Sequence, residues 1–161
     1  MNIEYVPHSF AHQFSEREMA SIERMLKLDL PNFEFDPIYL SHIKSHHGGK
    51  PVQKFFHTSS GLCLPIERFL NFSDTSSAPH DDKIFNISVV WSLIEDRLNE
   101  YLVPFAALPN GDFLCFDYEH ENPPQIVLWI NELSAEDQPQ IEPVSQDFKT
   151  FLHSLSPTIE P

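Results

Sequence analysis

The spacing of apolar residues changes along the chain, from helical spacing at the start to strand spacing after residue 100. Apolar residues first recur at helical spacing from Met19 to Leu26. Ser15 and Glu18 precede them as a capping box, in which each side chain bonds the backbone N–H of the other residue. Pro31 stops the run, so the sequence predicts a first helix from about residue 15.

Two further helices are predicted before residue 100. Asp36-Pro37 is an N-cap followed by a proline suited to the first helical position, and Gly48-Gly49 ends that helix. Ser88 is the expected cap of a longer helix whose apolar positions run to Leu98. Between them we expect extended pieces at 52–56 and 62–64, a helical turn at 66–70 and an exposed loop at 73–82.

After residue 100 the pattern predicts an antiparallel meander. Strands are expected at 102–108, 113–118 and 126–130, and Asn110-Gly111 is a two-residue hairpin signal. The second strand is apolar on both faces and should therefore be central. A last helix, capped by Ser145, has apolar residues at helical spacing from Phe148. The fold class is α+β: an antiparallel sheet with N-terminal helices, a middle helix and a C-terminal helix packed on it.

Size and composition indicate one cytoplasmic domain covering residues 1–161, with its core at about 15–155. The chain has 161 residues, of which 41% are hydrophobic and 14 are Phe. It contains no long apolar run for a membrane span, and its opening lacks the pattern of a signal peptide. Cys63 and Cys115 are far apart without a CxxC motif, and we expect both to be reduced.

Negative charge is concentrated in the second half of the chain. The net charge is −14, and no Lys or Arg occurs from Leu98 to Phe148, against ten Asp and Glu residues. Such a segment repels phosphate backbones and anionic lipid and attracts a basic surface. Direct binding of nucleic acid or membrane is therefore not expected. On charge alone, a surface that only keeps the protein soluble is the favoured interpretation.

Five segments, taken in order, resemble the signature of the SUKH superfamily, also called the fungal cell-wall-synthesis-regulator (Smi/Knr) type. The central match is residues 105–118 (FAALPNGDFLCFDY) followed by 123–129 (PPQIVLW). The others are 47–51 (HGGKP), 64–69 (LPIERF) and 148–152 (FKTFL). His47 departs from the Asn that is usual in the family. The resemblance implies this family's α+β fold and a binding function, because many short bacterial members are immunity proteins that neutralise a toxin domain, often a nuclease.

Catalytic and metal chemistry have weaker support in the sequence. No phosphate-binding glycine loop, GxSxG, HExxH or CxxC motif is present, so neither a cofactor nor an enzyme activity is expected. His42 and His46 have the spacing of two metal ligands but no evident third ligand, and a structural role is the simpler interpretation. Glu119-His120-Glu121 could suggest acid–base work, yet neighbouring loop residues do not converge on one point. A metal-dependent hydrolase ranks last.

The expected partner is therefore a basic protein, with a toxin domain as the first hypothesis and a regulatory scaffold that binds a cellular protein or peptide as the alternative. An inhibitor that covers the basic cleft of a nuclease should present clustered carboxylates. Loops at hairpin ends are the natural place for them. The candidate partner-binding residues are Asp112, Asp117, Glu119, Glu121, Glu132, Glu136 and Asp137.

Overall fold

The structure, a computed structural model, describes residues 3–120 and 123–159. The helices are α1 (Glu16–Leu26), α2 (Pro37–Ser45), α3 (His80–Lys83), α4 (Ile87–Ile94) and α5 (Phe148–Ser154), with 3-10 turns η1 (Glu95–Arg97) and η2 (Asn131–Leu133). The strands are β1 (Phe55–His57), β2 (Cys63–Pro65), β3 (Arg68–Phe69), β4 (Leu102–Ala107), β5 (Phe113–Asp117), β6 (Gln125–Trp129) and β7 (Ile141–Ser145). The predicted α+β class is confirmed.

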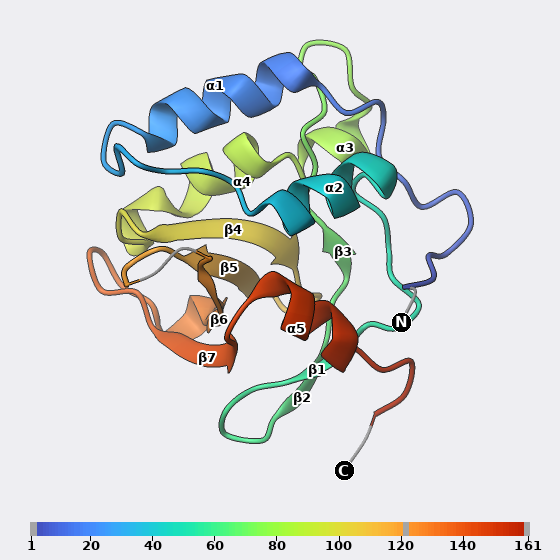
Figure 1. Ribbon diagram of the computed structural model, residues 1–161, viewed down its shortest axis with the longest axis vertical. Coiled ribbons are helices and arrows are strands. Elements are labelled where there is room, and N and C mark those ends of the chain that lie inside the picture. Colours follow the sequence, from blue (N-terminus) through green and yellow to red (C-terminus); the bar gives the residue numbers. More distant parts are fainter. Residues whose placement is uncertain (1–2, 121–122, 160–161) are drawn as a thin grey trace.

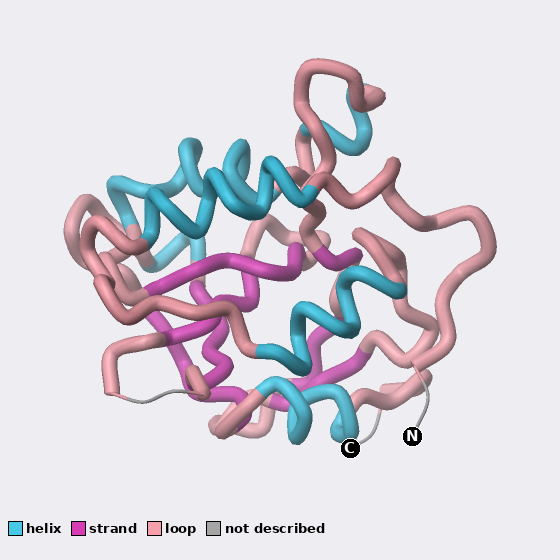
Figure 2. The backbone as a smooth tube through the Cα atoms, turned by 45° about the horizontal axis from the view of Figure 1, so that its top comes forward, coloured by secondary structure: helices cyan, strands magenta, loops and turns pink. Residues whose placement is uncertain are grey.

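The strands form two antiparallel sheets. The larger has the order β3-β4-β5-β6-β7, so β5 is central as its two apolar faces predicted. β1 and β2 form a separate hairpin at the lower edge in Figure 1. Helices α1 and α4 run side by side above the strands in both ribbon and tube views, while α5 lies in front of the sheet (Figures 1 and 2).

Helices α1 and α2 begin where the sequence predicted. Ser15 Oγ accepts a hydrogen bond from the backbone N–H of Glu18, and Asp36 Oδ1 accepts one from Ile38. The second half of the expected capping box is not formed, because the Glu18 carboxylate accepts from Ser88 Oγ instead, at 3.1 Å. That bond ties the start of α1 to the first turn of α4.

Several local predictions were wrong in their details. The cap of α4 is Asn86, whose Oδ1 accepts from two backbone N–H groups, and Ser88 lies inside the helix. Asp147, not Ser145, caps α5, since Ser145 belongs to β7. The hairpin between β4 and β5 has a three-residue loop closed by the bond from Leu108 N to Asp112 O, with Gly111 at a φ of 90°.

The sequence did not predict the two edge strands, β3 and β7. Residues 66–70 were expected as a helical turn, but Leu70 N donates to Phe105 O and the segment is extended along β4. β7 carries Pro143, which is tolerated because this strand lies at the sheet edge. Its carbonyl accepts from the N–H of Ser59, so the β1–β2 hairpin covers part of that edge.

A cluster of aromatic rings fills the space between the sheet and helices α2 and α5. Tyr39 is fully buried, with its ring centroid 4.9 Å from that of Phe116 and 5.4 Å from that of Phe148. Phe105 stacks on Phe116 at 4.3 Å. These edge-to-face and offset contacts add to the burial of large apolar surfaces. The Tyr39 hydroxyl is buried without a hydrogen-bond partner among the described residues.

Replacing Tyr39 by Phe should leave the free energy of unfolding unchanged or raise it by up to about 1 kcal/mol, because the change removes a buried hydroxyl that has no partner. Tyr118→Phe is the matched control, since the Tyr118 hydroxyl donates to Glu34 O, and it should cost about 1 kcal/mol. Denaturant titration measures both. A clear loss of stability in Tyr39→Phe would mean that this hydroxyl has a partner.

Candidate functional site

Two of the seven candidate carboxylates have structural roles: Asp112 in the loop before β5, and Asp117 at the last residue of β5. Asp112 is 7% exposed, and its carboxylate accepts from the backbone N–H of Asn131 and from Asn110 Nδ2, both at 3.0 Å. Asp117 is 8% exposed and accepts from the N–H of Glu119 at 3.0 Å. Burial raises the pKa of the Asp117 carboxyl, and the bond from Glu119 opposes that effect.

The other described candidates are exposed but follow opposite ends of strands β5 and β6. Glu119 comes after the Asp117 end of β5, which pairs with the start of β6. Residues 131–137, which carry three more candidates, come after the Trp129 end of β6. The ends of β5 are about 14 Å apart at roughly 3.4 Å per residue. Glu121 lies outside the described residues.

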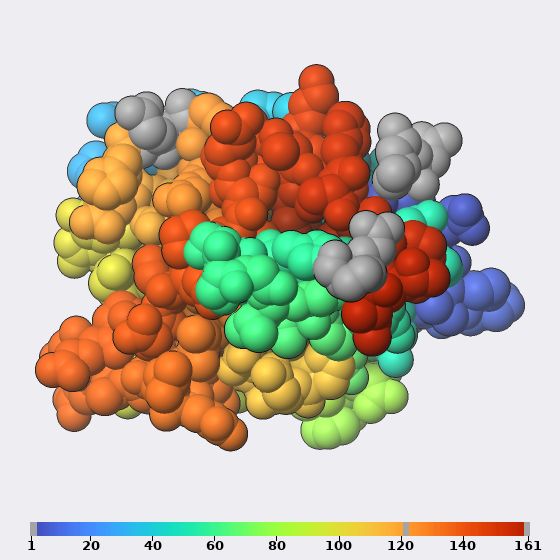
Figure 3. All heavy atoms as spheres, turned by 90° about the horizontal axis from the view of Figure 1, so that it is seen from below, coloured from blue at the N-terminus to red at the C-terminus, as the bar shows by residue number. Residues whose placement is uncertain are grey.

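The segment at 95–100 lies between these two groups. Asp137 N donates to Asp96 O at 2.9 Å, which places η1 against the 131–137 segment. Glu100 lies near the other group, since it precedes Tyr101, whose carbonyl accepts from the N–H of Tyr118 at 3.0 Å. Residues near 100 (yellow) lie between the two loops (light and dark orange) in Figure 3, and all three are at the left of Figure 1.

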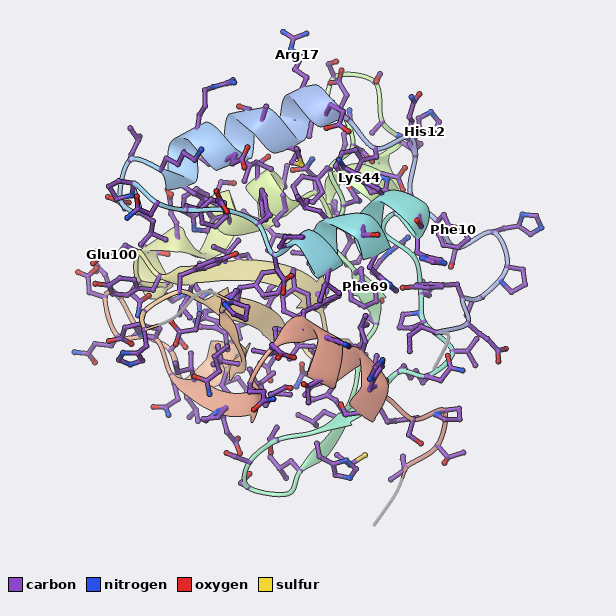
Figure 4. The ribbon with its side chains drawn as sticks, viewed as in Figure 1. Phe10, His12, Arg17, Lys44, Phe69 and Glu100 are labelled. Atoms are coloured by element: carbon purple, nitrogen blue, oxygen red, sulfur yellow. The ribbon has the colours of Figure 1, made fainter. Side chains whose placement is uncertain are left out.

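We call this surface the acidic edge. Its members are exposed carboxylates on three segments: Glu95, Asp96, Glu100, Glu119, Glu132, Glu136 and Asp137. Figure 4 shows Glu100 at this side of the molecule, while Arg17 points away from the top of α1. Sequence reasoning missed Glu95, Asp96 and Glu100. The available signal was three acidic residues within the seven that join α4 to β4.

Arg97 is the single Lys or Arg in the sequence of these three segments, and its guanidinium is engaged internally. Nη1 donates to Asn131 Oδ1 at 2.6 Å, and the group lies 5.0 Å from the centroid of the Trp129 ring. The Trp129 Nε1–H in turn donates to Arg97 O. Arg97 thus fastens η1 to β6 and η2, and the exposed charge of the edge stays negative.

The histidines that follow α2 or lie on it have structural partners. His42 Nε2 is hydrogen-bonded to the Tyr5 hydroxyl, and the His46 ring stacks against both of these rings. His47 is buried: its Nδ1–H donates to His12 O, and its Nε2 accepts from the N–H of Phe72 at 2.8 Å. His12, in the segment before α1, lies beside the end of α2, on the other side of the molecule from Glu100 (Figure 4).

The chemistry available to these groups is limited. Within residues 3–120 and 123–159, no three His, Cys, Asp or Glu side chains are grouped so that they could hold a metal ion. Cys63 and Cys115 are free thiols, and burial raises the pKa of Cys115 far above its usual value, so it stays protonated inside the sheet. His120 and Glu119 form an exposed pair with 3.8 Å between Nε2 and Oε2.

Asp112→Ala should lower the free energy of unfolding by about 1–3 kcal/mol, because it leaves the N–H of Asn131 without its acceptor. Glu132→Ala, an exposed member of the acidic edge, should change it by no more than about 0.5 kcal/mol. Chemical denaturation of both variants separates the structural carboxylate from the surface one. Equal changes in the free energy of unfolding would show that Asp112 is no more structural than Glu132.

The stability should depend on pH through His42. Burial, with a smaller contribution from His46, lowers the pKa of His42 to about 4, against about 6.5 in an unfolded chain. The unfolded chain therefore binds more protons at this site between these values. The stabilisation is complete above pH about 6.5 and is lost progressively as the pH falls towards 4.

His42→Gln should reduce the slope of unfolding free energy against pH between 6.5 and 5, because the glutamine does not titrate. The exposed His153 provides the matched control variant, His153→Gln, which should keep the wild-type slope. Urea titrations at several pH values measure both. If His42→Gln has the wild-type slope, the histidine does not couple folding to protonation.

Comparison with known proteins assigns the chain to a family. No curated protein and no solved structure matches the chain. Within the described residues, no helix is long and apolar enough to cross a membrane. A family model, SMI1 / KNR4 family (SUKH-1), matches residues 13–154, which include every helix and strand from α1 to α5. The chain therefore belongs to the SMI1 / KNR4 family (SUKH-1).

Proposed function

We propose that this chain is a non-catalytic, cytoplasmic immunity-type protein that binds a basic partner, foremost a toxin domain such as a nuclease, through its acidic edge. The observation that carries the proposal is the gathering of exposed carboxylates from three segments on one side of the fold, beside a single internally bonded Arg97. Family membership supports a binding role of immunity or regulatory type.

The negative charge of the acidic edge suits it to bind a nuclease. A nuclease needs a positively charged cleft to hold nucleic acid. Carboxylates that face this cleft accelerate the association of the two proteins. By occupying the cleft, they also exclude the nucleic acid substrate. The edge is built on loops held by a rigid sheet, and Asp112 and Asp117 fasten those loops through backbone hydrogen bonds. The surface is therefore arranged before the partner arrives.

The described residues support one domain as the unit of function. A single cluster of buried apolar residues extends from Ile22 in α1 to Leu155 after α5. Two groups of types that serve in catalysis have other roles: His47 is bonded on both ring nitrogens, and Cys115 is buried. These observations favour binding over catalysis.

The triple variant Glu119→Lys, Glu132→Lys, Glu136→Lys should weaken partner binding at least tenfold and flatten its dependence on salt, because attraction across the interface becomes repulsion. Asp137 is left unchanged, since its φ of 57° disfavours lysine. The matched control reverses three exposed acids elsewhere, at Glu4, Asp74 and Asp81, and should bind as the wild type does.

The experiment uses the wild-type chain as bait in cells of its source, followed by affinity measurement with the captured partner across a series of salt concentrations. Co-expression then tests protection: the wild type and the control should rescue cells from a toxic partner, and the triple variant should not. A partner that is harmless to cells would support the regulatory alternative. If the triple variant binds the partner with unchanged affinity, the acidic edge is not the binding surface.

A further inference from the structure

A cleft of about 390 Å³ opens next to the acidic edge, between the loop that follows α1 and the end of β5. It is lined by residues 29–33, Tyr118 and His120. A volume of this size is in the range of sites for small ligands and single side chains, about 300–1,000 Å³.

The walls of this cleft are held in place by internal contacts. Phe33 is 2% exposed, and its ring centroid is 4.9 Å from that of Tyr118. The Tyr118 hydroxyl donates to Glu34 O at 3.2 Å, and the Tyr118 N–H donates to Tyr101 O at 3.0 Å. The loop is closed by the bond from Phe33 N to Leu30 O. The aromatic surface is thus fixed before a ligand binds.

The polar groups around these rings include hydrogen-bond acceptors and negative charges. Asp29 and Asn32 are exposed lining residues. Glu119 lies beside His120 at the rim, and Tyr101, bonded to Tyr118, is next to Glu100. Lys27 is the cation nearest in sequence but does not line the cleft.

We infer that this cleft receives an arginine side chain of the basic partner. A guanidinium is planar, stacks on aromatic faces and donates several hydrogen bonds to carboxylate and amide oxygens, which matches Tyr118, Asp29 and Asn32. A lysine ammonium satisfies the charge but lacks the planar face for stacking. The inference rests on the proposed function, because it names the anchor through which the basic partner would be held.

Nuclear magnetic resonance titration with capped Gly-Arg-Gly peptide tests the cleft without the partner. We expect amide shifts concentrated at residues 29–33 and 118–120, with weaker binding of Gly-Lys-Gly and none of Gly-citrulline-Gly, which keeps the shape and removes the charge. Asp29→Asn should weaken the arginine peptide about two- to fivefold. Asp81→Asn, an exposed acid outside the cleft, should not change it. Equal response to citrulline, or shifts elsewhere, would overturn the inference.

Tyr118 supplies a second pair of variants. Tyr118→Phe keeps the ring and should keep peptide binding, whereas Tyr118→Leu should lose it, with the dispersion of the amide spectrum reporting that the protein is still folded.

The cleft and the proposed function can each be refuted without the other. A basic partner that binds Asp29→Asn and Tyr118→Leu normally, with no peptide shifts at the cleft, removes the cleft alone. Peptide binding with no basic partner captured removes the proposed function alone.

Discussion

Tyr39 packs its ring against Phe105, Phe116 and Phe148, and so joins α2, β4, β5 and α5 through one set of buried aromatic contacts. These rings fix where the helices sit on the sheet, because their edge-to-face geometry admits few alternative arrangements in a close-packed interior. The position of α2 also fixes the histidines at its end, and the position of β5 fixes the loops at both its ends. The aromatic cluster thereby determines which segments can meet at the surface.

The acidic edge follows from that arrangement. Close-packed β4, β5 and β6 leave their connecting segments to run over the surface, where charged side chains remain hydrated. Asp112 and Asp117 are exceptions: their burial is offset by bonds to backbone N–H groups that would otherwise lack acceptors. Arg97, held by Asn131 and Trp129, brings Glu95 and Asp96 next to the loop after β6. The groups that hold the loops in place and the exposed acidic groups are therefore different residues.

The sequence predicted those features that depend on near neighbours along the chain. Ser15 and Asp36 begin their helices because an N-cap needs only the next two or three backbone N–H groups. Strands β3 and β7 could not be read from their own residues, because Arg68–Phe69 and the segment around Pro143 become strands only by pairing with β4 and β6. The same limit applies to the candidate site. Glu132 and Glu136 were proposed from their charge, the family resemblance and their place after a predicted strand, but burial of Asp112 and the link through Asp96 depend on contacts between distant segments.

The most direct test of the acidic edge is a hydrogen-exchange map of the chain with and without its captured partner. Binding through the acidic edge and the cleft predicts added protection at residues 95–101, 118–120 and 131–137 and in the loop at 29–33, with little change in the segment before α1. Protection confined to the histidine side of α2 or to the β1–β2 hairpin would contradict it, because those surfaces lie outside the region where the exposed carboxylates gather.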